Sequence, residues 1–246
     1  MLTVACYLWT DPVWKHSGTF LYNPGHVRQL QKAVARNLTI PHEFVCITDK
    51  PHAFDADKDI RPIPIDRTKH IPGTEYVKLM TFHPLSRELI GERVFQLDLD
   101  TVIVGNLDQL VDRGEDVVVW RNPTRLPYDN PVVASRPYYN GSVILHRCGT
   151  WPAVWNFNTK MPNRPRDTQV WMSHVLGPNA PYWDGNDGIY RLAREDTPGS
   201  GVSGELPANA RIVTFPGDMG KPWLPEVRKA NPWIEKYWPE EVSLDW

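Results

Sequence analysis

Apolar runs alternate with amphipathic segments along the first half of the chain. Residues 2–8 and 44–48 are apolar almost throughout, which is typical of strands that are buried on both faces of a sheet. Between them, residues 27–38 place apolar side chains at the spacing of one helix face. This alternation of strands and helices predicts an α/β domain with a largely parallel sheet.

Further predicted elements are shorter and less regular. We expect strands at residues 60–65, 117–120, 143–145 and 211–215, and helical segments at 76–82, 85–90, 106–111, 151–157 and 168–176. Gly, Ser, Asp and Pro dominate residues 184–208, which predicts a mobile surface segment. The tail, residues 225–246, mixes Trp with acidic residues, and we expect it to pack on the surface.

One further predicted strand ends in two acidic residues. Residues 94–97 are mostly apolar, Asp98 and Asp100 follow one residue apart, and a second apolar run occupies residues 102–104. Ligands of parallel sheets bind beyond the carboxyl ends of the strands, which is where both carboxylates fall. A bend between Asp98 and Asp100 would let both reach one cation, whereas an ordinary strand-to-turn junction also accounts for such residues.

A divalent cation is the natural partner of two such carboxylates. Because Asp98 and Asp100 are close in sequence, they are expected to repel each other, and Mn2+ or Mg2+ removes that repulsion. It follows from this interpretation that replacing either residue by Asn leaves the empty protein as stable as before, or more stable.

Charge and composition narrow the classes of partner. The 246 residues carry a formal net charge of −2, which offers no electrostatic attraction to nucleic acid or to an anionic membrane. No apolar run approaches the about 20 residues of a transmembrane segment, and no export signal is visible, so we expect a cytoplasmic protein. The three cysteines are scattered, and we expect buried, reduced thiols.

Four stretches, taken in order, resemble glycogenin-like (family 8-type) retaining glycosyltransferases. They are residues 96–110, which include both acidic residues; residues 139–145, Tyr-Asn-Gly-Ser-Val-Ile-Leu; residues 167–171, Asp-Thr-Gln-Val-Trp; and Phe-Pro-Gly at 215–217 with Lys-Pro-Trp at 221–223. The resemblance implies the A-type nucleotide-diphospho-sugar transferase fold, in which a mixed, mostly parallel central sheet is flanked by helices. It covers roughly residues 2 to 223.

The same resemblance implies a domain organisation and a reaction. A single domain would span residues 1–224, with a nucleotide-binding half over about 1–112 and a sugar- and acceptor-binding half over about 113–224. The tail at 225–246 would follow it. A sugar would pass, with retention of its anomeric configuration, from a nucleotide-diphospho-sugar (UDP-linked on this resemblance) to an acceptor. The acceptor is left open among a glycan, a lipid-linked sugar and a protein.

The resemblance also assigns roles to individual residues. Asp98 and Asp100 would hold Mn2+ or Mg2+ against the diphosphate, whose charge grows as the glycosidic bond breaks. The expected donor-binding residues are Leu8, Lys78, Asp98, Asn140, Gly141, Gly217 and Lys221, and the candidate catalytic residues are Gln169, Asp167 and Asn140. Simpler roles are open for several of them. Asn140, Asp167 and Gln169 could be ordinary turn or helix-cap residues, and Lys78 and Lys221 could be solvent-exposed lysines.

The chain departs from the family pattern at three places. The family supplies a metal-binding His beside the closing Gly, but residues 214–217 are Thr-Phe-Pro-Gly, and Asp218 is the one nearby carboxylate. An adjacent Asp-Gln pair in the family is split here, since Thr168 lies between Asp167 and Gln169. The segments that would face the acceptor match nothing in the pattern.

Two other functions fit parts of the sequence. The run Asp-Leu-Asp-Thr-Val at 98–102 also fits the nucleophile motif of haloacid-dehalogenase-type phosphatases. There the motif follows the first strand of the domain, whereas at least two strands and a helix are predicted before it here. The missing His also fits a nucleotide-sugar-binding protein without transfer activity.

Overall fold

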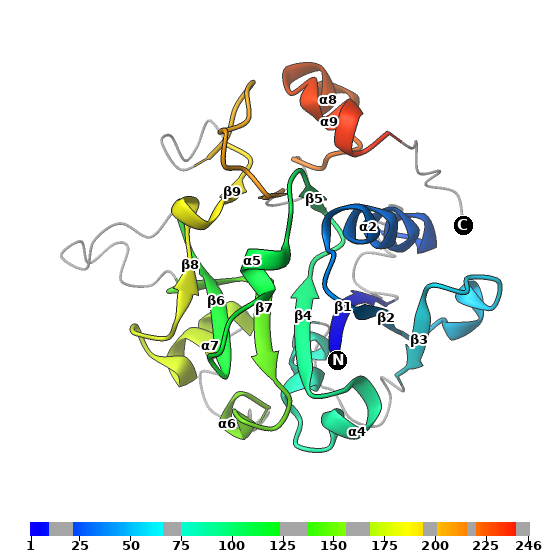
Figure 1. The fold of residues 1–246 in the computed structure, drawn as a ribbon, viewed down its shortest axis with the longest axis vertical. Coiled ribbons are helices and arrows are strands. Elements are labelled where there is room, and N and C mark those ends of the chain that lie inside the picture. The colour runs from blue at the N-terminus through cyan, green and yellow to red at the C-terminus, as the bar shows by residue number, and fades with distance from the viewer. Residues whose placement is uncertain are drawn as a thin grey trace.

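The computed structural model describes residues 1–9, 22–65, 75–123, 137–155, 168–193, 201–215 and 220–239. Within these residues the centre of the molecule is a seven-stranded sheet of order β3-β2-β1-β4-β7-β6-β8 (Figure 1). Its strands are β1 (Leu2–Leu8), β2 (His42–Thr48), β3 (Arg61–Pro64), β4 (Arg93–Leu97), β6 (Val117–Arg121), β7 (Tyr139–Arg147) and β8 (Tyr182–Trp183). Only β7 runs against its neighbours. The predicted mixed, mostly parallel sheet is therefore confirmed.

A second, three-stranded sheet lies above the carboxyl end of the central one (Figure 1). It contains β5 (Thr101–Ile103), β10 (Ile212–Thr214) and β9 (Ile189–Arg191), with β10 antiparallel to β5 and parallel to β9. Two short helices, α8 (Pro225–Ala230) and α9 (Trp233–Tyr237), lie at the same end. Val213 and Phe215 share a buried cluster with Ile234 and Trp238, so the part of the predicted tail that the structure describes, residues 225–239, packs on this sheet.

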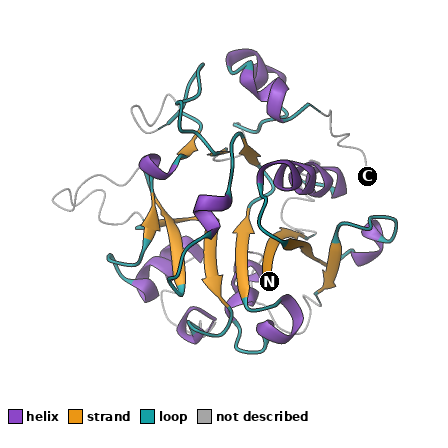
Figure 2. Cartoon of the chain, viewed as in Figure 1, coloured by secondary structure: helices purple, strands orange, loops and turns teal. Residues whose placement is uncertain are grey.

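Helices cover both faces of the central sheet (Figure 2). The other helical elements are α2 (Pro24–Asn37), η1 (Pro51–Phe54), η2 (Glu75–Phe82), α4 (Ser86–Ile90), α5 (Asp108–Val111), α6 (Pro152–Trp155), α7 (Thr168–Leu176) and η3 (Gly185–Asp187), where η marks a 3-10 helix. On one face, Leu30 of α2 and Leu110 of α5 share a buried cluster with Leu97 of β4. On the other face, Phe82 of η2 and Met172 of α7 pack against β6 and β7.

The helix predicted at 27–38 begins earlier than its apolar pattern indicated. The Asn23 side chain accepts hydrogen bonds from the backbone amides of Gly25 and His26, at 2.9 and 3.4 Å, and so caps the free amides of the first turn. Pro24 occupies the first helical position, where its missing N–H costs nothing. The cap, rather than the apolar stripe, sets the start of α2.

The prediction of a surface segment at 184–208 was wrong at residues 189–192 and at Val202, where the chain is paired with its neighbours. Residues 189–191 form β9, and Leu192 makes a β-bridge with Val202. Ile189 is buried in the main core and Leu192 is buried beside Val213 and Phe215, and this burial outweighs the Gly- and Ser-rich composition around them. Residues 194–200 lie outside the described residues.

The cysteines and the helix lengths bear on two of the predictions made from composition. Cys6, Cys46 and Cys148 are free and buried, as predicted. Among the described residues, no helix has both the length and the apolar character needed to cross a membrane. The division of the chain at residue 224 stays a prediction.

Candidate functional site

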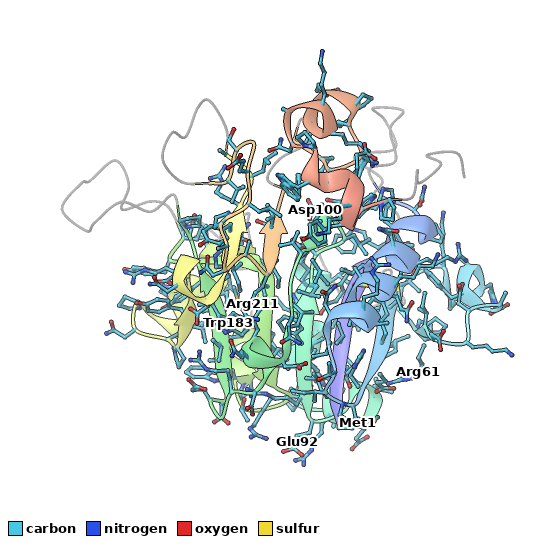
Figure 3. All side chains as sticks on the ribbon, turned by 45° about the horizontal axis from the view of Figure 1, so that its top comes forward. Met1, Arg61, Glu92, Asp100, Trp183 and Arg211 are labelled. Carbon is cyan, nitrogen blue, oxygen red and sulfur yellow. The ribbon has the colours of Figure 1, made fainter. Side chains whose placement is uncertain are left out.

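The predicted bend at the two acidic residues lies where the two sheets meet. β4 ends at Leu97 in the central sheet, and β5 begins at Thr101 in the second sheet. The turn between them is closed by the Thr101 amide, which donates to the Asp98 carbonyl oxygen at 3.2 Å. Figure 3 shows Asp100 at the opposite end of the molecule from Met1, beyond the carboxyl end of the central strands. The chain therefore turns between Asp98 and Asp100, as a shared cation would require and as an ordinary strand-to-turn junction also would.

Asp98 is paired with a lysine from η2. Lys78 Nζ donates to Asp98 Oδ1 at 2.5 Å, and the two side chains are 24% and 17% exposed. The sequence predicted both residues at the donor site, and the structure brings them together. Their pairing was not predicted.

A buried polar network supports the backbone of Lys78. The Tyr7 hydroxyl donates to the Lys78 carbonyl oxygen at 2.9 Å and lies 3.1 Å from Gln96 Oε1. Burial raises the pKa of Tyr7 far above its ordinary range, so this hydroxyl stays neutral and keeps its proton. Sequence reasoning missed Tyr7 because it reads as an ordinary core residue of β1.

Asp100 is held by a lysine and a tyrosine. Lys221 Nζ donates to Asp100 Oδ2 at 2.5 Å and to the Tyr22 hydroxyl at 2.9 Å. The Tyr22 hydroxyl in turn donates to the same Asp100 oxygen at 2.9 Å. The Lys221 and Asp100 side chains are only 6% and 9% exposed. Tyr22 was not among the predicted site residues, because no motif marks it.

The two pairs correct the picture of crowded, mutually repelling carboxylates. Each acidic side chain faces an ammonium group within hydrogen-bonding distance. The described part of the site therefore carries two negative and two positive charges. Repulsion between Asp98 and Asp100 is not the dominant interaction in the empty protein, because each carboxylate has its own counter-ion.

Aromatic rings fasten the loop after β10 to the start of α2. The Trp223 ring lies 4.3 Å from the His26 ring and 5.7 Å from the Tyr22 ring, centroid to centroid. His26 is fully buried, and burial lowers its pKa from 6.5 to about 4, so it is neutral at pH 7. Its Nδ1 accepts from the backbone amide of Asn23 at 3.0 Å. These contacts position Tyr22 and the segment that carries Lys221.

Asn140 and Gln169, two of the candidate catalytic residues, lie at the same edge of the sheet. Because β7 is antiparallel to β4, its first residues are next to the end of β4, and the Asp98 amide donates to the Ser142 carbonyl oxygen at 3.0 Å. Asn140 Oδ1 accepts from the Ser142 amide at 2.8 Å, which is the local turn role foreseen as the alternative for Asn140. A Cβ atom on Gly141 would lie 3.3 Å from Gln169 Cγ. Gly141 thus lets the first turn of α7 approach the site.

Three predicted site residues are not seen in this group: one lies in the core, and two lie outside the described residues. Leu8 ends β1, and the whole residue is only 2% exposed and packed in the main core, which is the environment of an ordinary core residue. Asp167 and Gly217 lie outside the described residues, as does Asp218. Their assignments stay predictions.

The side chains that could be metal ligands determine what kind of metal binding fits the site. Among the described residues there is no group of three His, Cys, Asp or Glu side chains that could hold a metal ion. Two carboxylates suit Mg2+ or Mn2+ that arrives with phosphate oxygens and keeps part of its water. Asp98 and Asp100 therefore fit a cation that is shared with a ligand, but they do not make a complete protein cage.

The fold is similar to those of solved glycosyltransferases. An active-site mutant of LgtC matches with a TM-score of 0.59 at 12% sequence identity, covering 96% of this chain and 94% of that chain. The galactosyltransferase LgtC in complex with donor and acceptor sugar analogues matches with a TM-score of 0.56 at 12% identity. Apo GlyE from Streptococcus pneumoniae TIGR4 matches with a TM-score of 0.60 at 11% identity, covering 99% of this chain and 61% of that chain.

Comparison of the amino-acid sequence with known families and proteins finds no match. No protein-family model matches the chain, and no curated protein matches it. At 11–12% identity the structural likeness establishes the fold, and the chain has the predicted A-type glycosyltransferase fold.

Proposed function

We propose that this protein is a metal-dependent glycosyltransferase that moves a sugar from a nucleotide-diphospho-sugar to an acceptor. The observation that carries this proposal is the turn at Asp98 and Asp100, which lies at the ligand-binding end of the sheet with an ammonium group beside each carboxylate. Acidic residues for a cation and lysines for phosphate are what a diphosphate donor requires. A UDP-sugar is the donor that the sequence resemblance favours.

The residues divide into a diphosphate end and a sugar end. Asp98 and Asp100 would hold Mn2+ or Mg2+, which would neutralise the charge that the leaving diphosphate gains. Lys221 would bind the same phosphates as a point charge, and Lys78 would hold Asp98 in place. Gln169 and Asn140 would contact the transferred sugar. Retention follows from the resemblance, with Gln169, Asp167 and Asn140 as candidate catalytic residues and a front-face path without a protein nucleophile as the alternative.

Thermal shift with a panel of nucleotide sugars, with and without Mn2+, tests the proposal. A donor at about 100 times its Kd adds ~2.7 kcal/mol to the free energy of unfolding. For a chain of this size that raises the melting temperature by roughly 5–11 °C. The shift should require the metal and should disappear in Asp98→Asn. No shift with any nucleotide sugar would contradict the proposal.

A second measurement separates the phosphate contact from loop packing. Lys221→Ala should weaken binding of UDP more than binding of uridine, because only UDP carries the diphosphate charge. Equal weakening of both ligands would mean that Lys221 acts only by supporting its loop.

Transfer itself distinguishes an enzyme from a binding protein. The missing His of the family pattern is the reason for the alternative of a catalytically impaired nucleotide-sugar-binding protein. Slow hydrolysis of the donor, or transfer to any acceptor, would exclude that alternative. The phosphatase alternative fits poorly, since the acidic motif follows β4 rather than the first strand. Absence of p-nitrophenyl phosphate turnover is the expected result.

A further inference from the structure

Asp100 already has a cation in the empty protein. Its Oδ2 atom accepts from Lys221 Nζ at 2.5 Å and from the Tyr22 hydroxyl at 2.9 Å. The pair is almost closed to solvent, with side-chain exposures of 6% for Lys221 and 9% for Asp100. A divalent ion on the remaining oxygen of Asp100 would lie against this ammonium with little water between them. The two cations would therefore compete for one carboxylate.

We propose that Lys221 occupies Asp100 as a built-in counter-ion, held by Tyr22, and so makes the site select a metal–nucleotide complex over the free metal. This inference rests on the proposed function, since it assumes that Asp98 and Asp100 receive a metal with the donor. It assigns to Lys221 a role in metal selection in addition to phosphate binding. It assigns to Tyr22 the role of a positioning residue.

Charge balance gives the physical reason. The described site contains two carboxylates and two ammonium groups, so it is neutral when empty. A free divalent ion would leave this poorly solvated site with excess positive charge, and Lys221 would lose its partner. A diphosphate brings negative charge with the metal, and its oxygens offer Lys221 a new charge-assisted hydrogen bond. The exchange is therefore unfavourable for the metal alone and compensated for the complex.

The surroundings of the two residues allow such an exchange. The Tyr22 ring is held edge-on by Trp223, at 5.7 Å, and by His26, at 5.8 Å. The ammonium of Lys221 ends a flexible four-carbon stem, lies 5.4 Å from the Tyr22 ring centroid, and makes its third contact, to the Phe215 carbonyl oxygen, at 3.4 Å. The tyrosine can thus stay on Asp100 while the lysine moves to the phosphate.

A calorimetric titration of the full chain with Mn2+ alone, without nucleotide, tests the inference. The variants are wild type, Lys221→Met, and Lys221→Met combined with Asp100→Asn. Wild type should bind Mn2+ negligibly without nucleotide. Lys221→Met should bind it at least about tenfold more tightly, because a charge-assisted hydrogen bond contributes that much or more to an equilibrium. The double variant should lose the gain.

Two further variants complete the test: a matched control, and a substitute in case Lys221→Met does not fold. Lys229→Met removes the same charge from an exposed position on α8 and should leave Mn2+ binding as in wild type. If Lys221→Met does not fold, Tyr22→Phe serves instead. It keeps the ring contacts, removes one donor from Asp100 and one acceptor from Lys221, and should give a smaller gain in Mn2+ affinity.

The outcomes separate the inference from the proposed function. Tight Mn2+ binding by nucleotide-free wild type, or no gain in a folded Lys221→Met variant, would overturn the inference even if Mn2+ and UDP bind together. Failure of wild type to bind UDP in the presence of Mn2+ would overturn the proposed function. In wild type, UDP should raise the affinity for Mn2+ and Mn2+ should raise the affinity for UDP by the same factor. That mutual factor should shrink in Lys221→Met.

Discussion

Asp100→Asn should destabilise the empty protein, contrary to the expectation from carboxylate repulsion. The substitution removes the counter-ion of Lys221, whose side chain is 6% exposed, and leaves a buried ammonium facing a neutral amide. Breaking a buried pair by removing one partner costs about 3–5 kcal/mol. The amide oxygen and the Tyr22 hydroxyl still accept from Lys221, so we expect the lower part of that range. For a chain of this size, 3 kcal/mol lowers the melting temperature by roughly 6–12 °C.

Asp98→Asn supplies an internal comparison. Its pair with Lys78 is more exposed, at 17% and 24%, so solvent screens the charges and replaces part of the lost contact. We expect a loss of about 1 kcal/mol for Asp98→Asn. The structure thus predicts that two chemically identical substitutions, two residues apart, differ severalfold in their effect on stability.

Urea unfolding of ligand-free protein, followed by tryptophan fluorescence, measures both effects. The m-value should stay constant, which would show that the native state keeps its compactness. Asp100→Asn combined with Lys221→Met should recover much of the loss, because no buried charge is then left alone. An Asp100→Asn variant as stable as wild type, or more stable, would refute the reasoning and restore the repulsion picture.

Three further predictions concern buried histidines of the fold and two residues that support the site. His26 and His146 are buried and neutral, with pKa values lowered by burial from 6.5 to about 4 and about 3. The unfolded chain takes up protons below pH 6.5 and the folded chain does not, so stability is full above pH 6.5. The free energy of unfolding should fall by about 1.4 kcal/mol per pH unit for each His as the pH drops toward 4. A free energy of unfolding that does not change between pH 6.5 and pH 4 would contradict this. Tyr7→Phe should cost about 1–3 kcal/mol in urea unfolding and weaken UDP binding through Lys78, whereas a loss of stability with unchanged UDP affinity would limit Tyr7 to a core role. Gly141→Ala should push on the Gln169 side chain and lower transfer while UDP binding stays unchanged, and equal loss of both would place Gly141 at the diphosphate instead.

Much of the fold was predictable because it depends on local pattern. The apolar runs of β1, β2 and β6 can only be buried on two faces of a sheet, and α7 was predicted with its observed bounds at 168–176. The end of β4 was marked by a change from apolar to acidic residues, which located the ligand-binding edge. Asn140, Gly141 and Gln169 were placed there by resemblance. The antiparallel pairing of β7 with β4 brings the start of β7 next to Asp98, and Gln169 of α7 lies beside Gly141.

Tertiary structure alone decided which charges meet. Lys221 is 121 residues from Asp100 and 199 residues from Tyr22 along the chain, so no local pattern relates them. Likewise, α8 and α9 escaped prediction because their burial depends on the second sheet, whose strands come from three distant segments. Sequence determines which residue types are available near the end of a strand. The counter-ion of each carboxylate depends on loops that only the completed core brings within hydrogen-bonding distance, since electrostatic pairing is set by separation in space and by burial.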